Sequence, residues 1–316
     1  MRLVSFNHEG NHRIGACIED RIIDLNYACE EMLKAQGQLR AKPIADAYVP
    51  ANMVEFLQGG EQSKALAKEA IAFATQSGIH FSRKVILSIS DVRLEAPVQH
   101  PSKMICVGHN YREHILEMGR ELPPYPVVFA KFANTIIGPQ DDIPLYPVSD
   151  QLDYEAEFAF VIGKRARNVT QQDALDYVAG YTIANDVTYR DLQRRTIEWL
   201  QGKTVEGSAP MGPWLVTTDE IENPSGMDVV LTVNGEERQR SNTKNLVFTV
   251  PYLVEFLSNL MTLEPGDIIL TGTPGGVGVA RAPQVFLQDG DVVSIEIDQI
   301  GVLTNQVKKV KQGESR

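Results

Sequence analysis

A stretch reading LDYEAEFAFVIG, residues 152–163, constrains the fold of this chain more than any other. Successive side chains of an extended strand point to opposite faces, so Phe158 and Phe160 share one face while Glu155 and Glu157 share the other. The two carboxylates then lie about 7 Å apart along the strand. Burying two unpaired like charges is costly, so this segment is either a solvated strand end or a strand with a cation beside it.

The remaining pattern predicts an α+β fold, mainly β, with two domains. From about Met104 onward, strand-forming runs alternate with Gly and Pro and no βαβ repeat is sustained, which favours a mixed β architecture over a doubly wound sheet. Before that point, short strand-like runs and the helical periodicity of residues 62–75 predict a small α+β domain. The Pro-bearing stretch LEAPVQHPSK marks the boundary, giving an N-terminal domain over 1–95 and a larger domain over 96–316.

Three local patterns within the larger domain predict individual elements. Thr170 as a cap and Gly180 as a stop predict a helix over residues 170–179. The amphipathic spacing of TYRDLQRRTIEWLQ predicts a second helix over residues 188–201. Asn234-Gly235 between two strand-like runs predicts a hairpin turn.

Composition narrows the possible partners and location. The net charge of -11 disfavours nucleic acid and anionic membranes, which reward clustered Lys and Arg, but allows a small anionic substrate in a locally basic pocket. No apolar run approaches the roughly 20 residues that span a bilayer. The N-terminal residues lack the apolar stretch of a signal peptide, so we expect a cytoplasmic location.

The larger domain offers a metal mainly oxygen ligands. None of the six histidines lies beyond His114, and the three cysteines form no CxxC pair. Asp186 ends the strand-like run YTIAND, where its side chain can reach a pocket beside a neighbouring strand, although a lone Asp there is usually a helix cap. Together with Glu155 and Glu157, it would form an octahedral oxygen site suited to Mg²⁺ or Mn²⁺.

Two further groups have the residue types of a substrate site. Arg190 and Gln193 follow Asp186 along the same predicted helix face, where Arg190 suits bidentate capture of a carboxylate; a solvated surface charge is an equal alternative. His114 and Glu117 are spaced i and i+3, which allows a carboxylate to orient an imidazole as a general base, although such a pair is usually just surface. His109 is the weaker candidate because no carboxylate partner is evident.

Asn110 and Glu113 resemble the N-terminal cap of the helix that carries His114, and Gly119 marks its end. Further on, the run EPGDIILTGTPGGVG places Thr271, Gly272 and Thr273 after a strand, in a loop whose backbone N–H groups and hydroxyls suit an anion. This loop lacks the lysine of a nucleotide-binding P-loop.

Taken together, a series of blocks in order resembles the C-terminal catalytic domain of the fumarylacetoacetate hydrolase superfamily over residues 103–307. The blocks are GHNYREHILEMG, PVVFAKF, LDYEAEFAFVIG, GYTIANDVTYRDLQ, GKT, PMGPWLV, VNGE, LEPGDIILTGTPGGVG and GVLTNQV. The first part of the chain resembles the small leading domain of the longer bacterial members. The resemblance implies a mixed β-sandwich roll for the catalytic domain and a homodimer.

The same resemblance implies roles for individual residues. It implies that Glu155, Glu157 and Asp186 bind a divalent metal, usually Mg²⁺ or Mn²⁺, and that His114 and Glu117 form a catalytic dyad on a lid that becomes ordered with substrate. Lys203 matches the pocket lysine, and a further set matches residues at or near the substrate's oxo-acid end: Lys131, Arg190, Gln193, Gly272 and Thr273. Where many members continue GKSFD, this chain has GKTVEG, which leaves the wall beside Lys203 open.

These features predict chemistry at a small anionic 2-oxo acid. We expect a metal-dependent hydrolase that cleaves a C–C bond in an acylpyruvate or fumarylpyruvate type of substrate, with His114 activating water and Lys203 neutralising oxyanion charge. The alternatives are an oxaloacetate decarboxylase and an isomerase or dehydratase of ring-cleavage products. A non-catalytic metal-binding regulator is less favoured because the dyad, the three acids and the lysine are all present.

Overall fold

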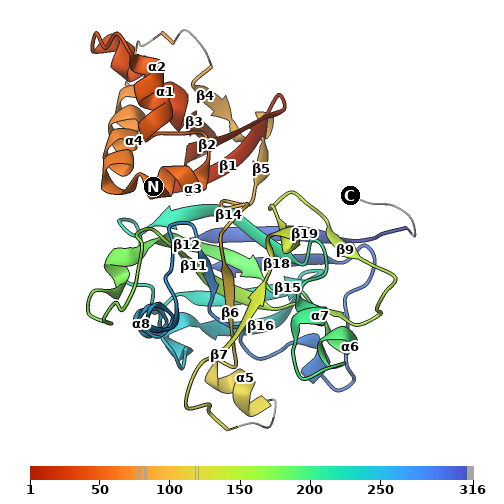
Figure 1. Ribbon diagram of the computed structural model, residues 1–316. Helices are drawn as coiled ribbons and strands as arrows, with labels where there is room; N and C mark the ends of the chain where they lie inside the picture. The colour runs from red at the N-terminus through yellow and green to blue at the C-terminus, as the bar shows by residue number, and fades with distance from the viewer. Residues whose placement is uncertain (77, 79, 82–83, 118, 120, 312–316) are drawn as a thin grey trace.

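The computed structural model describes residues 1–76, 78, 80–81, 84–117, 119 and 121–311 (Figure 1). Within these residues no helix is long and apolar enough to cross a membrane. The N-terminal strands are β1 (Arg2–His8), β2 (Asn11–Ile18), β3 (Arg21–Asp24), β4 (Ile86–Ser88) and β5 (Arg93–Glu95). The helices between them are α1 (Leu25–Ala35), α2 (Ala41–Tyr48), α3 (Met53–Gln58) and α4 (Gly60–Ala74). The predicted small α+β arrangement is therefore present, with the predicted helix over 62–75 inside α4 but for its last residue.

The rest of the chain is rich in strands. These are β6 (Met104–Gly108), β7 (Val127–Lys131), β8 (Ile136–Ile137), β9 (Ile143–Leu145), β10 (Leu152–Asp153), β11 (Ala156–Ile162), β12 (Val178–Asn185), β13 (Thr188–Tyr189), β14 (Ala209–Thr217), β15 (Asp228–Val233), β16 (Glu236–Asn242), β17 (Ile268–Leu270), β18 (Val292–Ile297) and β19 (Gly301–Lys309). The α-helices are α5 (Arg112–Glu117), α6 (Arg190–Gln193), α7 (Leu200–Lys203) and α8 (Val250–Leu260). Single 3-10 turns η1 (Ile89–Asp91), η2 (Ala133–Thr135), η3 (Ala174–Tyr177), η4 (Thr243–Asn245) and η5 (Gly278–Ala280) complete the fold.

One large mixed sheet runs through both parts of the molecule. Its strand order is β4-β3-β2-β1-β14-β12-β11-β17-β6-β7, and the N-terminal strands join the rest where β1 pairs with β14, Leu3 opposite Leu215. Figure 1 shows the N-terminal helices and β1–β5 above this junction and the remaining strands below it. The domain boundary at 95/96 stays a prediction, and it falls between two parts that share a sheet.

The alternation predicted for residues 152–163 separates two hydrophobic cores. Phe158 and Phe160 of β11 belong to the core shared with the five-stranded sheet β16-β15-β18-β19-β9. Ala159 and Val161 point to the opposite face, into the core formed with the N-terminal helices. A strand buried on both faces excludes the solvated alternative for its acidic side chains, and the stacked sheets give the expected β-sandwich.

Of the three predicted local elements, one is absent, one is divided and one is present as predicted. Residues 170–179 do not form a helix: only η3 is present, and β12 begins at Val178 because burial in the sheet outweighs the local capping signal. The helix predicted over 188–201 is broken into α6 and α7. Asn234 and Gly235, with φ of 53° and 80°, form the predicted hairpin turn between β15 and β16.

The predicted cap at Asn110 is also wrong. Its side chain donates to the carbonyls of Phe248 and Thr271 and accepts from the Phe248 amide, so it joins two loops instead of capping α5. The local sequence alone did not show these distant partners.

Candidate metal and substrate site

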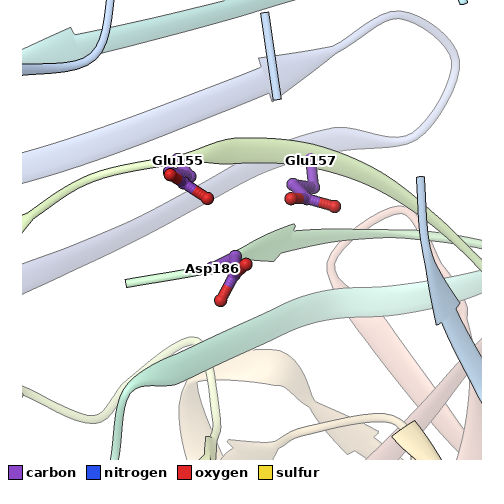
Figure 2. A group of neighbouring side chains, drawn as sticks. All are labelled: Glu155, Glu157 and Asp186. Carbon is purple, nitrogen blue, oxygen red and sulfur yellow. The ribbon is translucent and has the colours of Figure 1, made fainter. Parts of the chain in front are cut away.

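Three carboxylates meet where β11 begins and β12 ends. Glu155 directly precedes β11, Glu157 is its second residue, and Asp186 follows β12 directly, with Ala156 paired opposite Asn185. One oxygen from each acid lies within 4.8 Å of the other two, and all three side chains are buried (Figure 2). The predicted cluster is therefore assembled by strand pairing between segments about 30 residues apart.

Three buried cations surround these acids. The Lys203 ammonium donates to Glu155 at 2.8 Å and to Asp186 at 2.6 Å. Lys131 pairs with the other oxygen of Asp186 at 2.9 Å, and Arg190 pairs with Glu155 at 2.7 Å. Burial would raise the pKa of Glu155, but the charges of Lys203 and Arg190 outweigh burial and hold it well below its ordinary value.

Asp153 is a fourth buried carboxylate that the sequence analysis missed. It lies in β10 and accepts from Arg190 Nε at 2.7 Å and from the backbone N–H groups of Gly278 at 2.8 Å and Val279 at 3.0 Å. It thereby fixes Arg190 to the loop that carries Val279. The signal was available, because Asp153 continues the alternation of Glu155 and Glu157 by one further step of two.

The charges of this cluster do not balance. Four carboxylates, Asp153, Glu155, Glu157 and Asp186, face three cations, Lys131, Arg190 and Lys203, which leaves a net charge of about one negative unit. This imbalance falls on Glu157, whose ionised form is disfavoured: burial, then the charges of Asp186 and Glu155, raise its pKa well above the ordinary value.

A divalent cation fits this donor set. Hard cations prefer carboxylate oxygens, and two oxygens on one Mg²⁺ lie at most about 4.2 Å apart at ordinary bond lengths of about 2.1 Å. The triad therefore needs only small side-chain shifts from its spread of 4.8 Å. Ionising Glu157 inside this cluster is costly without a cation, and a bound cation would remove that cost.

The loop after β17 holds Glu157 from one side. Gly272 donates its N–H to Glu157 at 2.6 Å and has φ of +98°, and a Cβ there would come within 2.8 Å of the Val107 carbonyl. The Thr273 hydroxyl accepts from Gln239, whose side chain also binds the backbone of Ala156. Gln239, from β16, is a second supporting residue that no sequence pattern indicated.

The predicted dyad, His114 and Glu117, lies on the short helix α5. His114 is buried, with Nδ1 3.4 Å from Glu117, and the Glu117 carboxylate accepts from the Gly276 N–H at 3.1 Å. The hydrogen bond from His114, opposed by burial and supported by Gly276, lowers the pKa of Glu117. Glu117 thus both contacts the imidazole and fastens α5 to the glycine-rich loop.

The pocket lies between these groups. The predicted site residues among its lining are His114, Glu155, Glu157, Arg190, Gln193, Lys203 and Thr273. Its apolar walls include Phe129, Trp199 and Val277, and the ring of Trp199 packs edge-to-face on Phe129 and on His109, which also lines the pocket. Gln193 accepts from Arg190 at 3.1 Å.

Four predicted site residues lie beside the pocket and are not part of its lining: Glu117, Lys131, Asp186 and Gly272. Lys131 is buried behind Asp186, where it also donates to the Val187 carbonyl and the Ser208 hydroxyl, so its substrate contact stays a prediction. The segment GKTVEG, which differs from the GKSFD of many family members, lies against η2, where Asn134 donates to the Thr204 carbonyl and to Glu206. Neither Thr204 nor Glu206 lines the pocket.

Sequence comparison places this chain with one family of known proteins. The family model described as fumarylacetoacetate (FAA) hydrolase C-terminal matches residues 103–308. Oxaloacetate tautomerase fahd2, mitochondrial, of Xenopus laevis is 42% identical over 97% of this chain and 90% of its own. Oxaloacetate tautomerase YisK of Bacillus subtilis (strain 168) is 40% identical over 93% of this chain and 95% of its own.

Solved structures show the same fold over nearly the whole chain. A fumarylacetoacetate hydrolase from psychrophilic Exiguobacterium antarcticum has a TM-score of 0.78 and 36% identity, covering 98% of this chain and 100% of its own. Maleylpyruvate hydrolase from Sphingobium sp. SYK-6, in complex with manganese (II) ion and pyruvate, has a TM-score of 0.74, 30% identity and the same coverage.

Proposed function

The chain belongs to the fumarylacetoacetate hydrolase family, a family of enzymes, and on that premise we propose that it is a metal-dependent tautomerase acting on oxaloacetate. The observation that carries the proposal is one pocket lined by Glu155, Glu157, His114 and cationic side chains. Asp186 completes the buried triad behind it, and Glu117 pairs with His114. The similarity to two oxaloacetate tautomerases at 40% identity or more supports this substrate. Hydrolysis, the reaction expected from the sequence, has weaker support, since the maleylpyruvate hydrolase is 30% identical to this chain.

The metal would be held by Glu155, Glu157 and Asp186. When bound, Mg²⁺ or Mn²⁺ would supply positive charge that favours the enolate form of a 2-oxo acid. Lys203 and Arg190 keep Glu155 ionised and oriented toward this position, and Lys131 does the same for Asp186. The Mn²⁺ complex of the Sphingobium relative supports a divalent ion.

Tautomerisation needs one proton moved and no atom added. The keto form loses a proton from C3 and gains one at the 2-oxygen, and the reverse restores it. Glu117 accepts a hydrogen bond from His114 Nδ1–H, so the unprotonated Nε2 would be the base that takes the proton from C3. The Lys203 ammonium lies beside Glu155 and Asp186, whose charges raise its pKa against burial, and it would stabilise negative charge on the substrate oxygens.

Hydrolysis of an acylpyruvate is the second candidate. The same His114 could activate water, and the 30% identical maleylpyruvate hydrolase supports this chemistry. Oxaloacetate decarboxylation would use the same cation and no attacking water. The predicted homodimer and the cytoplasmic location stay predictions.

The test follows the loss of the ultraviolet enol absorbance of oxaloacetate, together with pyruvate release from oxaloacetate and from acetylpyruvate. Rates are measured with Mg²⁺ or Mn²⁺, with EDTA, and against a metal-only blank. We expect metal-dependent enol loss without matching pyruvate release, and at least a 100-fold decrease in His114→Gln with metal content unchanged. Pyruvate release from acetylpyruvate alone would favour the hydrolase, and release from oxaloacetate alone would favour the decarboxylase.

A further inference from the structure

Arg194 is a cation at the pocket whose guanidinium pairs with no carboxylate among the described residues. It lines the pocket with an exposed side chain, and it forms no ion pair within the described part of the chain. The other cations of the site differ: Arg190 binds Asp153, Glu155 and Gln193 through its three nitrogens, and Lys203 binds two carboxylates. Arg190 therefore has little capacity left for a substrate carboxylate.

Backbone geometry places Arg194 on the pocket side of α6. Its N–H donates to the Arg190 carbonyl at 3.2 Å, and its φ and ψ of -96° and 0° continue the helical turn. Residues i and i+4 lie on one helix face with about 5–6 Å between their Cβ atoms. Arg194 thus lies one turn outward from Arg190, toward the solvent-exposed end of the pocket.

We propose that Arg194 binds the distal carboxylate of a dicarboxylic 2-oxo acid and so makes the pocket select dicarboxylates over monocarboxylates. The identity of the reacting end rests on the proposed function. The charge of the site supports the inference, because a dianion entering a cluster of four acids and three paired cations gains from a further cation even after one divalent ion is bound. An exposed guanidinium matches a carboxylate in bidentate geometry.

The experiment compares two ligands that differ only at the distal group, malate and 2-hydroxybutyrate, by calorimetric titration of the Mg²⁺-loaded protein. We expect Arg194→Gln to weaken malate binding roughly 10- to 100-fold, the usual cost of a hydrogen bond to a charged group, while 2-hydroxybutyrate binding is unchanged. Arg195→Gln is the matched control: it removes the same charge from the adjacent residue, which is exposed and faces Asp191 at 3.9 Å.

Three results would overturn the inference. In the first, malate binds Arg194→Gln as tightly as wild type, or binds neither protein. In the second, Arg194→Gln weakens the binding of malate and of 2-hydroxybutyrate equally. In the third, Arg195→Gln weakens malate binding as much as Arg194→Gln does. A different result would contradict the proposed function and not this inference. Arg194-dependent preference for malate without any tautomerisation of oxaloacetate would contradict the reaction and leave the dicarboxylate site standing.

Discussion

Glu157 is the carboxylate of the site that no cationic side chain pairs with among the described residues. Its carboxylate accepts from the Gly272 N–H, and it forms no ion pair among the described residues. Glu155 and Asp186, by contrast, each contact two cations. This asymmetry distinguishes an ion-binding cluster from a closed salt-bridge network.

Glu157→Gln tests that asymmetry. We expect Mn²⁺ binding, measured by calorimetry, to weaken by more than the roughly 10- to 100-fold cost of losing an outer partner of a metal ligand. In EDTA the variant should unfold at the same temperature as wild type or higher, because Gln carries no charge and so avoids the cost of ionising residue 157 inside the cluster. Unchanged Mn²⁺ affinity would contradict the ligand assignment, and lower stability in EDTA would contradict the charge balance.

Asp153 is expected to act by positioning Arg190 and the loop at Val279. Asp153→Asn keeps the volume but removes the charge that Arg190 pairs with, so we expect at least a 10-fold loss of kcat with Mn²⁺ stoichiometry intact. The neighbouring, exposed Asp150→Asn is the control. Wild-type kinetics in Asp153→Asn would remove the positioning role.

At the scale of elements, the loop after β17 meets the sheet so closely that residue 272 must lack a side chain. Gly272→Ala should unfold at lower urea concentration than Gly290→Ala. Both positions have positive φ, +98° and +90°, but only at Gly272 would the Cβ contact other atoms. The shared φ strain costs about 1 kcal/mol, so an equal loss in the two variants would show that close approach adds nothing.

The docking of α5 should depend on pH through Glu117. Its pKa is lowered from an ordinary 4.5, so the docked helix holds the ionised form. Docking is then complete above pH 4.5 and weakens as the pH falls through the lowered pKa. Protection of the Gly276 amide from hydrogen exchange, corrected for intrinsic rates, should fall at acid pH in wild type. Glu117→Gln should lack this dependence, and an identical acid profile in both proteins would contradict the link.

At the scale of the whole molecule, the two predicted domains share both a sheet and a core. Leu3 pairs opposite Leu215, and residues such as Phe56 from α3 pack in one cluster with Val161 and Leu270. We expect calorimetry to show one cooperative unfolding transition that moves as a whole when Mn²⁺ is added. Two transitions, of which only one responds to Mn²⁺, would show that the parts unfold separately.

The sequence by itself determined the family, the mixed β fold and the strand that carries Glu155 and Glu157. Period-two alternation is a local property, and burial on both faces follows from the apolar residues on each side of β11. The hairpin at Asn234-Gly235 was likewise local, because it needs only residues that accept positive φ.

The tertiary structure alone decided how the site is balanced and where short elements end. Residues 170–179 entered a sheet instead of a helix, and Asn110 found partners far along the chain, at Phe248 and Thr271. Asp153, Gln239 and Arg194 gained their places through contacts or surfaces that no window of sequence contains. The physical reason is that burial energy and charge pairing depend on which distant groups surround a side chain, and only the folded chain brings those groups together.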